Sequence, residues 1–139
     1  MTGTYEHAID AKGRLFIPAK LREELGSSFY LAVGAGPFLA IYPQATWDRF
    51  VERISQVPIS QQTGAVRTLF ANASKCEVDS QGRIVVPRKL REYASLEKDT
   101  VMLGVNDRAE IWSAETWKAQ EEEAMTPEKM VAAMAALGL

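Results

Sequence analysis

The sequence has little of the chemistry that builds disulfide scaffolds, metal centres or membrane spans. Its 139 residues include one cysteine, Cys76, and one histidine, His7. A single cysteine cannot form an internal disulfide, which agrees with a reducing compartment. No apolar run approaches the roughly 18 residues of a membrane helix, and residues 1–6 lack the basic start and apolar run of a signal peptide. We therefore expect a cytoplasmic protein that does not associate with a membrane.

The sequence also lacks a strong net charge, and its value of −2 gives no overall attraction to nucleic acid. The charge is unevenly distributed, however. Residues 109–139 contain six acidic and two basic side chains, so residues 1–108 carry a net charge of +2. Residues 10–22 and 79–91 each hold four basic side chains and one acidic one. Because local charge sets the field that a phosphate backbone meets, these two stretches remain candidates for nucleic-acid binding.

What the sequence does contain is one stretch that occurs twice. Asp10–Glu23 reads DAKGRLFIPAKLRE and Asp79–Glu92 reads DSQGRIVVPRKLRE, an offset of 69 residues. Eight of the fourteen positions are identical, and three more exchange one apolar residue for another. The similarity continues beyond this core, since Leu31–Gly34 corresponds to Val101–Gly104. Two units of about forty residues could each have only a thin core alone, so we expect them to share one.

Each copy begins with the pattern Asp-x-x-Gly-Arg, which is typical of a tight turn. Gly13 and Gly82 can take a positive φ without a Cβ penalty. The carboxylates of Asp10 and Asp79 can accept hydrogen bonds from backbone N–H groups of the turn. The flanking segments have the composition of strands, so we predict a β-hairpin in each copy with its arginine beside the turn. These strands are expected at residues 5–9, 14–17, 74–78 and 83–86.

Proline marks the start of a helix after each hairpin. Pro18 and Pro87 cannot donate to a sheet but suit the first turn of a helix, which predicts short helices at residues 19–25 and 88–94. The remaining apolar segments are separated by turn residues and are typical of strands. They lie at residues 31–33, 39–42, 101–105 and 110–112.

Apolar residues at helical spacing predict the longer helices. One helix should follow each unit, with Thr46 as the N-cap of the first. Trp47 and Trp117 open these helices, and we interpret them as core anchors. Residues 60–73 should form a connecting helix. A last helix should run from residue 126 to residue 137, and its apolar stripe packs on its own domain, packs on a neighbouring subunit or is loosely attached. The stripe consists of Met130, Val131, Met134 and Leu137.

The repeated turn allows two interpretations from its residues alone. It could be a purely structural turn in which Asp and Arg satisfy each other. Alternatively, an arginine beside a tight turn offers fixed donors for guanine edges or phosphates. Basic residues persist around both copies, and a structural turn does not need them. This persistence favours nucleic-acid binding.

Enzyme and metal chemistry have little support. Asp10 and Asp79 are equivalent and could face each other as a metal-binding or acid–base pair, but each has a role in its own turn. His7 and Cys76 also correspond under the offset, yet two ligands fall short of the four in a structural zinc site, and packed residues are the expected alternative. The segment Gly34–Gly36 lacks the third glycine of a dinucleotide loop. We expect no enzyme, cofactor, metal or small-molecule substrate.

The doubled Asp-x-x-Gly-Arg, followed by an apolar triplet, proline and Lys-Leu-Arg-Glu, resembles the MraZ family, two-copy members of the AbrB/SpoVT swapped-hairpin group. The resemblance implies an α+β fold whose hairpin units interleave into one pseudo-twofold barrel with flanking helices. It implies a ring-shaped homo-oligomer and a nucleoid-associated transcriptional regulator, usually a repressor of its own operon. Its target would be short direct repeats in promoter DNA of the division and cell-wall gene cluster. The corresponding divisions are residues 1–57 and 74–119 for the two units, 58–73 for a helical connector and 120–139 for a C-terminal tail.

Carried over by position, the resemblance implies that Arg14 and Arg83 contact DNA. Lys12 lies inside the first turn where the second turn has Gln81, so the copies are chemically unequal. Gln81 would attract phosphate less but could read a base edge through its amide. The turns would be braced by Asp10, Gly13, Asp79 and Gly82. Further candidates on the short helices, which could direct them away from the groove, are Lys20, Arg22, Arg88, Lys89 and Arg91. The rival functions are a ring that binds protein partners and a metal-dependent enzyme built on the two aspartates.

Overall fold

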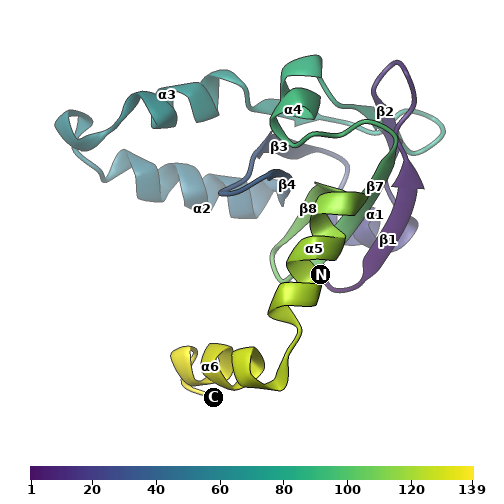
Figure 1. Cartoon of the computed structure of the whole chain (residues 1–139). Helices are drawn as coiled ribbons and strands as arrows, with labels where there is room; N and C mark the ends of the chain where they lie inside the picture. The colour runs from purple at the N-terminus through teal and green to yellow at the C-terminus, as the bar shows by residue number, and fades with distance from the viewer.

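The computed structural model describes residues 1–139 and shows an α+β protein with one large antiparallel sheet, a two-stranded ribbon and six α-helices (Figure 1). The strands are β1 Thr4–Ala8, β2 Arg14–Phe16, β3 Phe29–Val33, β4 Phe38–Pro43, β5 Ser74–Cys76, β6 Arg83–Val85, β7 Asp99–Val105 and β8 Arg108–Ser113. The helices are α1 Ala19–Leu25, α2 Gln44–Ser55, α3 Gly64–Ala71, α4 Arg88–Tyr93, α5 Ala114–Ala124 and α6 Pro127–Ala136, with a 3₁₀ turn, η1 Ile59–Gln61. The strands and short helices predicted from the repeats are therefore confirmed, most of them to within two residues.

The strands of the two repeats pair with one another. The six-stranded sheet has the order β1-β7-β8-β4-β3-β5, and exchanging each strand for its counterpart in the other repeat reproduces the same order reversed. β1 of the first repeat pairs with β7 of the second, and β5 of the second pairs with β3 of the first. The first repeat thus completes its sheet with a strand from the second, and the reverse also holds.

The prediction that each copy forms its own hairpin is wrong. β2 does not pair with β1 but with β6, with Leu15 opposite Ile84 at the centre of a two-stranded antiparallel ribbon. Each turn is closed locally, since the N–H of Asp10 donates to the Arg14 carbonyl and the N–H of Asp79 donates to the Arg83 carbonyl. The chain therefore turns where predicted, but the strand leaving the turn bonds to the equivalent strand of the other copy.

Alternation along the ribbon places every second residue in a core that both repeats build. Leu15 of β2 and Ile17 just after it are buried, and so are Ile84 of β6 and Val86 just after it, as expected for residues two apart along an extended chain. They belong to a single cluster of seventeen buried residues drawn from both repeats. The expectation of a shared core is confirmed.

The opposite face of the large sheet carries aromatic residues under two longer helices. Trp47 of α2 is buried and stacks on Tyr30 of β3, with ring centroids 4.6 Å apart. Trp117 of α5 contacts Trp112 of β8 edge-on at 5.2 Å. Both tryptophans therefore anchor their helices to the sheet, as predicted.

Two helix boundaries differ from prediction. Thr46 is not an N-cap, because α2 begins directly after Pro43 and the Thr46 hydroxyl donates to the Asp107 carbonyl at 3.1 Å. The connecting helix expected over residues 60–73 is confined to α3, and η1 precedes it. Pro58 lies between α2 and η1. Because proline cannot continue a helix, the two helical segments are separated there.

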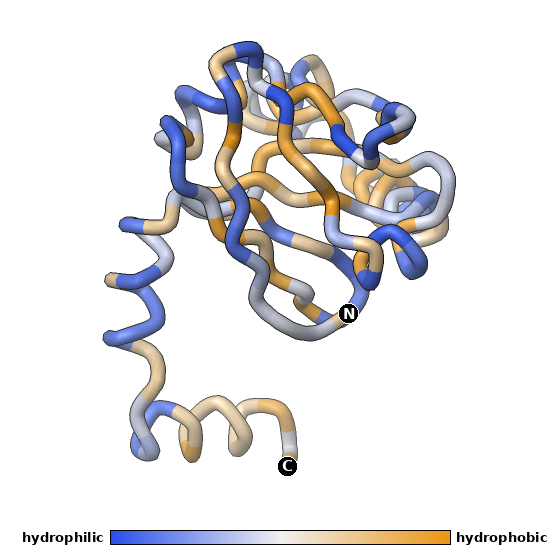
Figure 2. The backbone as a smooth tube through the Cα atoms, turned by 90° about the vertical axis from the view of Figure 1, so that its right-hand side faces the viewer, coloured by the Kyte–Doolittle hydropathy of each residue, from blue (hydrophilic) through white to orange (hydrophobic).

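The C-terminal helix extends away from the body. Figures 1 and 2 show α5 leading out of the sheet and α6 lying beyond it. Thr126 caps α6, since its hydroxyl accepts the backbone N–H of Lys129 at 3.2 Å. Of the alternatives for its apolar stripe, packing on its own domain is therefore wrong. None of the helices combines the length and the apolar character needed to cross a membrane.

Candidate nucleic-acid interface

Each Asp-x-x-Gly-Arg turn is organised by its aspartate. One carboxylate oxygen of Asp10 accepts the backbone N–H groups of Lys12 and Arg14 at 3.0 and 2.8 Å. One oxygen of Asp79 likewise accepts those of Gln81 and Arg83 at 2.8 and 2.9 Å. The two turns are therefore built alike, although one contains lysine where the other contains glutamine.

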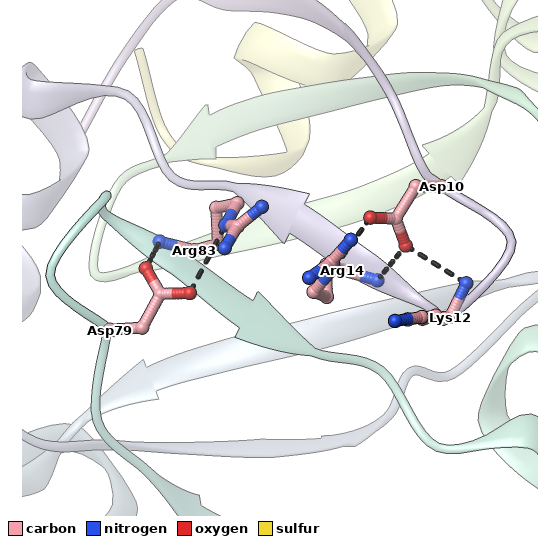
Figure 3. A network of polar contacts seen from close by, with 5 residues as sticks. All are labelled: Asp10, Lys12, Arg14, Asp79 and Arg83. Atoms are coloured by element: carbon pink, nitrogen blue, oxygen red, sulfur yellow. Dashed lines mark hydrogen bonds and ion pairs between the residues drawn. The ribbon is translucent and has the colours of Figure 1, made fainter.

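Each aspartate uses its other oxygen to hold the arginine of its own turn (Figure 3). The Nε of Arg14 donates to Asp10 at 2.6 Å, and the Nε of Arg83 donates to Asp79 at 3.1 Å. The backbone hydrogen bond from each arginine is the main cause that lowers the pKa of its aspartate, and the guanidinium adds to the effect. Both carboxylates are consequently ionised at neutral pH and keep the arginines oriented.

Orientation through Nε leaves the outer part of each guanidinium free. No protein atom accepts a hydrogen bond from the Nη groups of Arg14 or Arg83. Arg14 lies opposite Val85 on the ribbon and Arg83 lies opposite Phe16, so all four share the face that points away from the buried Leu15. The ribbon therefore presents two fixed pairs of donors side by side.

One arginine of each short helix, Arg22 of α1 and Arg91 of α4, lies against the turn of the other repeat. A Cβ added at Gly82 would meet the guanidinium carbon of Arg22 at 3.1 Å, and one added at Gly13 would meet that of Arg91, also at 3.1 Å. Gly13 and Gly82 have positive φ angles of 80° and 77°, as the turn prediction requires. Arg22 and Arg91 are thus not directed away from the turns, and each adds a positive charge next to the opposite motif arginine.

The remaining sequence candidates lie on the outside of the short helices. Lys20 and Lys89 are exposed. Arg88 is exposed too and forms an ion pair with Glu92 one helical turn later, at 2.9 Å between Nε and the carboxylate. The structure therefore brings the turn residues together with Arg22 and Arg91, whereas Lys20, Arg88 and Lys89 are exposed on the short helices without contact to the turns.

Known proteins share this doubled arrangement. The model of the MraZ protein family, which is described as antitoxin-like, matches residues 1–66 and 69–137, so it matches once for each repeat. The chain belongs to the MraZ family. The sequence prediction of that family is confirmed.

Several relatives carry the name "Transcriptional regulator MraZ". The relative from Heliobacterium modesticaldum is 48% identical over 124 residues, which covers 88% of this chain and 87% of that protein. The relative from Carboxydothermus hydrogenoformans is 48% identical over 117 residues, covering 83% and 82%. The relative from Lactiplantibacillus plantarum is 46% identical over 123 residues, covering 87% of each. Because the chain belongs to this family and these relatives are named as transcriptional regulators, the prediction that the chain is not an enzyme is confirmed.

The geometry of this MraZ-family chain does not assemble the alternative metal sites. Asp10 and Asp79 lie at opposite ends of the β2–β6 ribbon with the two arginines between them (Figure 3). His7 packs against Phe16, with ring centroids 5.1 Å apart, and Cys76 is half-buried beside the core, where burial raises the pKa of its thiol. No group of three or more histidine, cysteine, aspartate or glutamate side chains could hold a metal ion.

Sequence reasoning missed Phe16 as a component of the surface. Arg22 lies over its ring, with the guanidinium carbon 5.4 Å from the ring centroid. This contact fixes Arg22 near the turn of the second repeat through a cation–π interaction. The alternation of Leu15 and Ile17 with outward residues was a signal that could have placed Phe16 on this face, whereas its contact with Arg22 requires the fold.

A second basic cluster, also missed, lies on the aromatic side of the large sheet. Arg49 and Arg53 of α2 and Arg108 of β8 line a pocket of about 420 Å³ together with aromatic residues. Arg108 is already paired with the buried Glu110 at 3.0 Å. No local pattern announces this cluster, because Arg108 is more than fifty residues from α2 in the sequence.

Proposed function

We propose that the protein is a sequence-specific DNA-binding transcriptional regulator that acts as a repressor. Its targets would be short direct repeats in promoter DNA of the division and cell-wall gene cluster, including its own operon. The relatives named as transcriptional regulators support the class of function. The observation that carries DNA binding is that Arg14 and Arg83 are each held through Nε while their Nη groups remain free on one face of the ribbon.

A two-stranded ribbon of this kind fits a major groove about 12 Å wide, which admits either a helix or a β-ribbon. The free Nη groups would donate to O6 and N7 of guanine, the commonest specific contact of arginine. Arg14 and Arg83 are diagonal neighbours, for which Cα atoms are roughly 7–8 Å apart. That separation corresponds to about two base steps of 3.4 Å, so each arginine would read a different base pair.

The other candidates would bind phosphate and set the register. Lys12 is exposed within the first turn, and Arg22 and Arg91 add charge beside Gly82 and Gly13. Lys20, Arg88 and Lys89 would reach the phosphates at the edge of the groove. In this scheme Gln81 reads a base edge or contributes little, so the two turns contribute unequally.

We also propose that the two units form one interleaved pseudo-twofold module and that copies of it assemble into a ring. Two observations support a single module. Exchanging the strands of the two repeats gives the same sheet order reversed, and Leu15 of the first repeat pairs with Ile84 of the second. The chain is acidic overall, so one copy would bind DNA weakly at cellular salt. A ring that presents several modules to several repeats makes later contacts intramolecular, with avidity gains on the order of 10² or more.

The test is a comparison of promoter DNA carrying one, two and four repeats. The proposal predicts that affinity rises by on the order of tenfold or more with each added repeat that the ring can contact simultaneously, and no further once additional repeats lie out of its reach. DNA with four repeats at altered spacing serves as the control, because it keeps the charge and composition but prevents simultaneous contact. Equal affinity for one-repeat and four-repeat DNA would contradict the proposal.

A further inference from the structure

After its first turn, the helix α6 is apolar on every side. Residues 130–137 contain only methionine, valine, alanine and leucine. Met130, Val131, Met134 and Leu137 are 43%, 70%, 48% and 73% exposed. A helix that is hydrophobic all round is normally buried, so this one requires a partner surface.

The helix is fully formed without that partner. Thr126 caps its first turn and Pro127 occupies its first position, both of which favour helix formation there. It lies at the end of α5, on the opposite side of the molecule from α3 and α4 (Figure 1). A preformed apolar helix that projects from the body can dock without refolding, which reduces the ordering cost of binding.

A complementary groove lies at the far side of the same chain, between α3, α4 and the end of β3. Its volume is about 480 Å³, and Tyr93 in its wall is 45% exposed. The Tyr93 hydroxyl donates to the carbonyl of Gly34, another lining residue, at 2.8 Å, so the polar end of the ring is already hydrogen-bonded within the wall of the groove. The lining residues that this inference uses are Val33, Ala65, Leu69, Lys89, Leu90 and Tyr93.

We infer that α6 of one copy docks into the α3–α4 groove of a second copy. The inference rests on the assembly proposed above and names the contact that produces it. Charge supports this occupant: Lys89 lines the groove and the exposed Arg67 lies on α3, whereas α5 ends in Glu121–Glu123 and α6 begins with Glu128. In the docked arrangement, the acidic residues that precede and begin α6 would lie next to the basic residues at the edge of the groove.

The contact is heterologous, because each copy supplies a helix on one side and a groove on the other. Repetition of a heterologous contact produces a closed ring when the rotation closes and a filament when it does not. One apolar helix and one groove per chain are therefore sufficient to generate a multi-subunit assembly without any symmetric interface.

Two substitutions test the contact from its two sides. Val131→Glu places a charge on the exposed face of α6, and Ala65→Glu places one at the second residue of α3, in the groove. Both sites tolerate glutamate in a single copy, since Val131 is exposed and a carboxylate in the first turn of a helix is favourable. Ala45→Glu is the matched control, because Ala45 is an exposed alanine at the second residue of α2.

The mass of each variant in solution is measured by light scattering. Wild type and Ala45→Glu should form the same assembly, whereas Val131→Glu and Ala65→Glu should each fall to the single chain of 15.4 kDa. A mixture of the two variants keeps one intact helix and one intact groove, so it should form pairs of chains and nothing larger. A wild-type assembly larger than a pair, together with pairs alone in the mixture, is the outcome that a heterologous contact predicts and a reciprocal two-fold exchange of helices does not.

The outcomes separate this contact from the proposed function. If wild type assembles and both variants assemble equally well, the α6 contact is refuted while the ring and DNA binding stand. If wild type is a single chain at all concentrations, the proposed assembly itself fails, and with it this contact. Binding of one-repeat DNA should be unchanged in Val131→Glu, because α6 is remote from the β2–β6 ribbon (Figure 1).

Discussion

Arg22 of the first repeat lies against Gly82 of the second, where a Cβ atom added to the glycine would be 3.1 Å from the guanidinium carbon. The equivalent Arg91 of the second repeat lies against Gly13 of the first. The two arginines therefore pack against opposite ends of the ribbon, and each turn is in contact with an arginine side chain of the other copy. The match is not complete: the Nε of Arg22 donates to the Ile17 carbonyl at 2.9 Å, while the buried Nε of Arg91 has no partner.

The turn glycines should differ in their sensitivity to substitution. Gly13→Ala should destabilise most, because its new Cβ would lie 2.7 Å from the backbone carbonyl oxygen of Val86. Gly82→Ala should cost less, since its nearest neighbours are side-chain atoms at 3.1 Å that can move. Gly26→Ala is the control, with a positive φ of 84° and nothing within 4 Å, and should show the backbone cost alone, about 1–3 kcal/mol. Urea unfolding of the three variants checks this order, and equal losses would contradict the steric account.

The contribution of the turn aspartates to stability should be present at neutral pH and should change with pH only in the acidic range. The hydrogen bonds from the arginine N–H groups lower the pKa of Asp10 and Asp79 in the folded protein. The ionised carboxylates therefore stabilise the fold above about pH 4, the unfolded value, and this contribution is lost as the pH falls through the folded-state pKa. Asp10→Asn/Asp79→Asn should be less stable than wild type at pH 7, and the difference should shrink as the pH falls.

The control for this prediction is Glu97→Gln, which removes an exposed carboxylate that makes no hydrogen bond or ion pair in the structure. Its stability should follow that of wild type throughout. Thermal unfolding between pH 2 and pH 7 compares the three proteins. A constant difference between wild type and the double asparagine variant at all pH values would show that ionisation of these groups does not matter.

The unequal turns give a prediction about salt dependence. Each phosphate contact contributes about 0.9 to the slope of log affinity against log salt. Lys12→Gln should reduce the slope by about that amount, and Gln81→Lys should increase it by a similar amount. The exchange variant Lys12→Gln/Gln81→Lys keeps the net charge and should restore the wild-type slope. If all four proteins share one slope, the turns do not contact phosphate.

The local structure of the repeats could be predicted, but their pairing could not. The position of Gly13 and Pro18 fixes a turn and a helix start, and the structure has both where expected. The sequence pattern of these strands does not determine whether β2 pairs with β1 or with β6, because all three are short and half-apolar. The choice depends on the core, where Leu15 and Ile84 must meet to be buried together.

The site was predictable to the same extent. The role of Asp10 as a brace follows from its place in the turn, since its contacts are with Lys12 and Arg14 nearby in sequence. The contact of Arg22 with Gly82 joins residues sixty positions apart and was not predicted. The prediction of Thr46 as a cap was wrong for a similar reason, because its hydroxyl donates to the backbone carbonyl of Asp107 in the second repeat. Interactions within one turn can be read from sequence, and those between repeats require the fold.

The most direct test of DNA reading by the ribbon is a titration of fluorescent promoter DNA at several salt concentrations. It compares wild type with Arg14→Ala/Arg83→Ala and with Arg49→Ala/Arg53→Ala, which removes the same charge from α2. We predict a slope of several units for wild type, little change in the α2 variant, and loss of specific binding in a folded Arg14→Ala/Arg83→Ala protein. Equal binding by wild type and the folded Arg14→Ala/Arg83→Ala variant would show that the repeated turn is structural and that the ribbon does not read DNA.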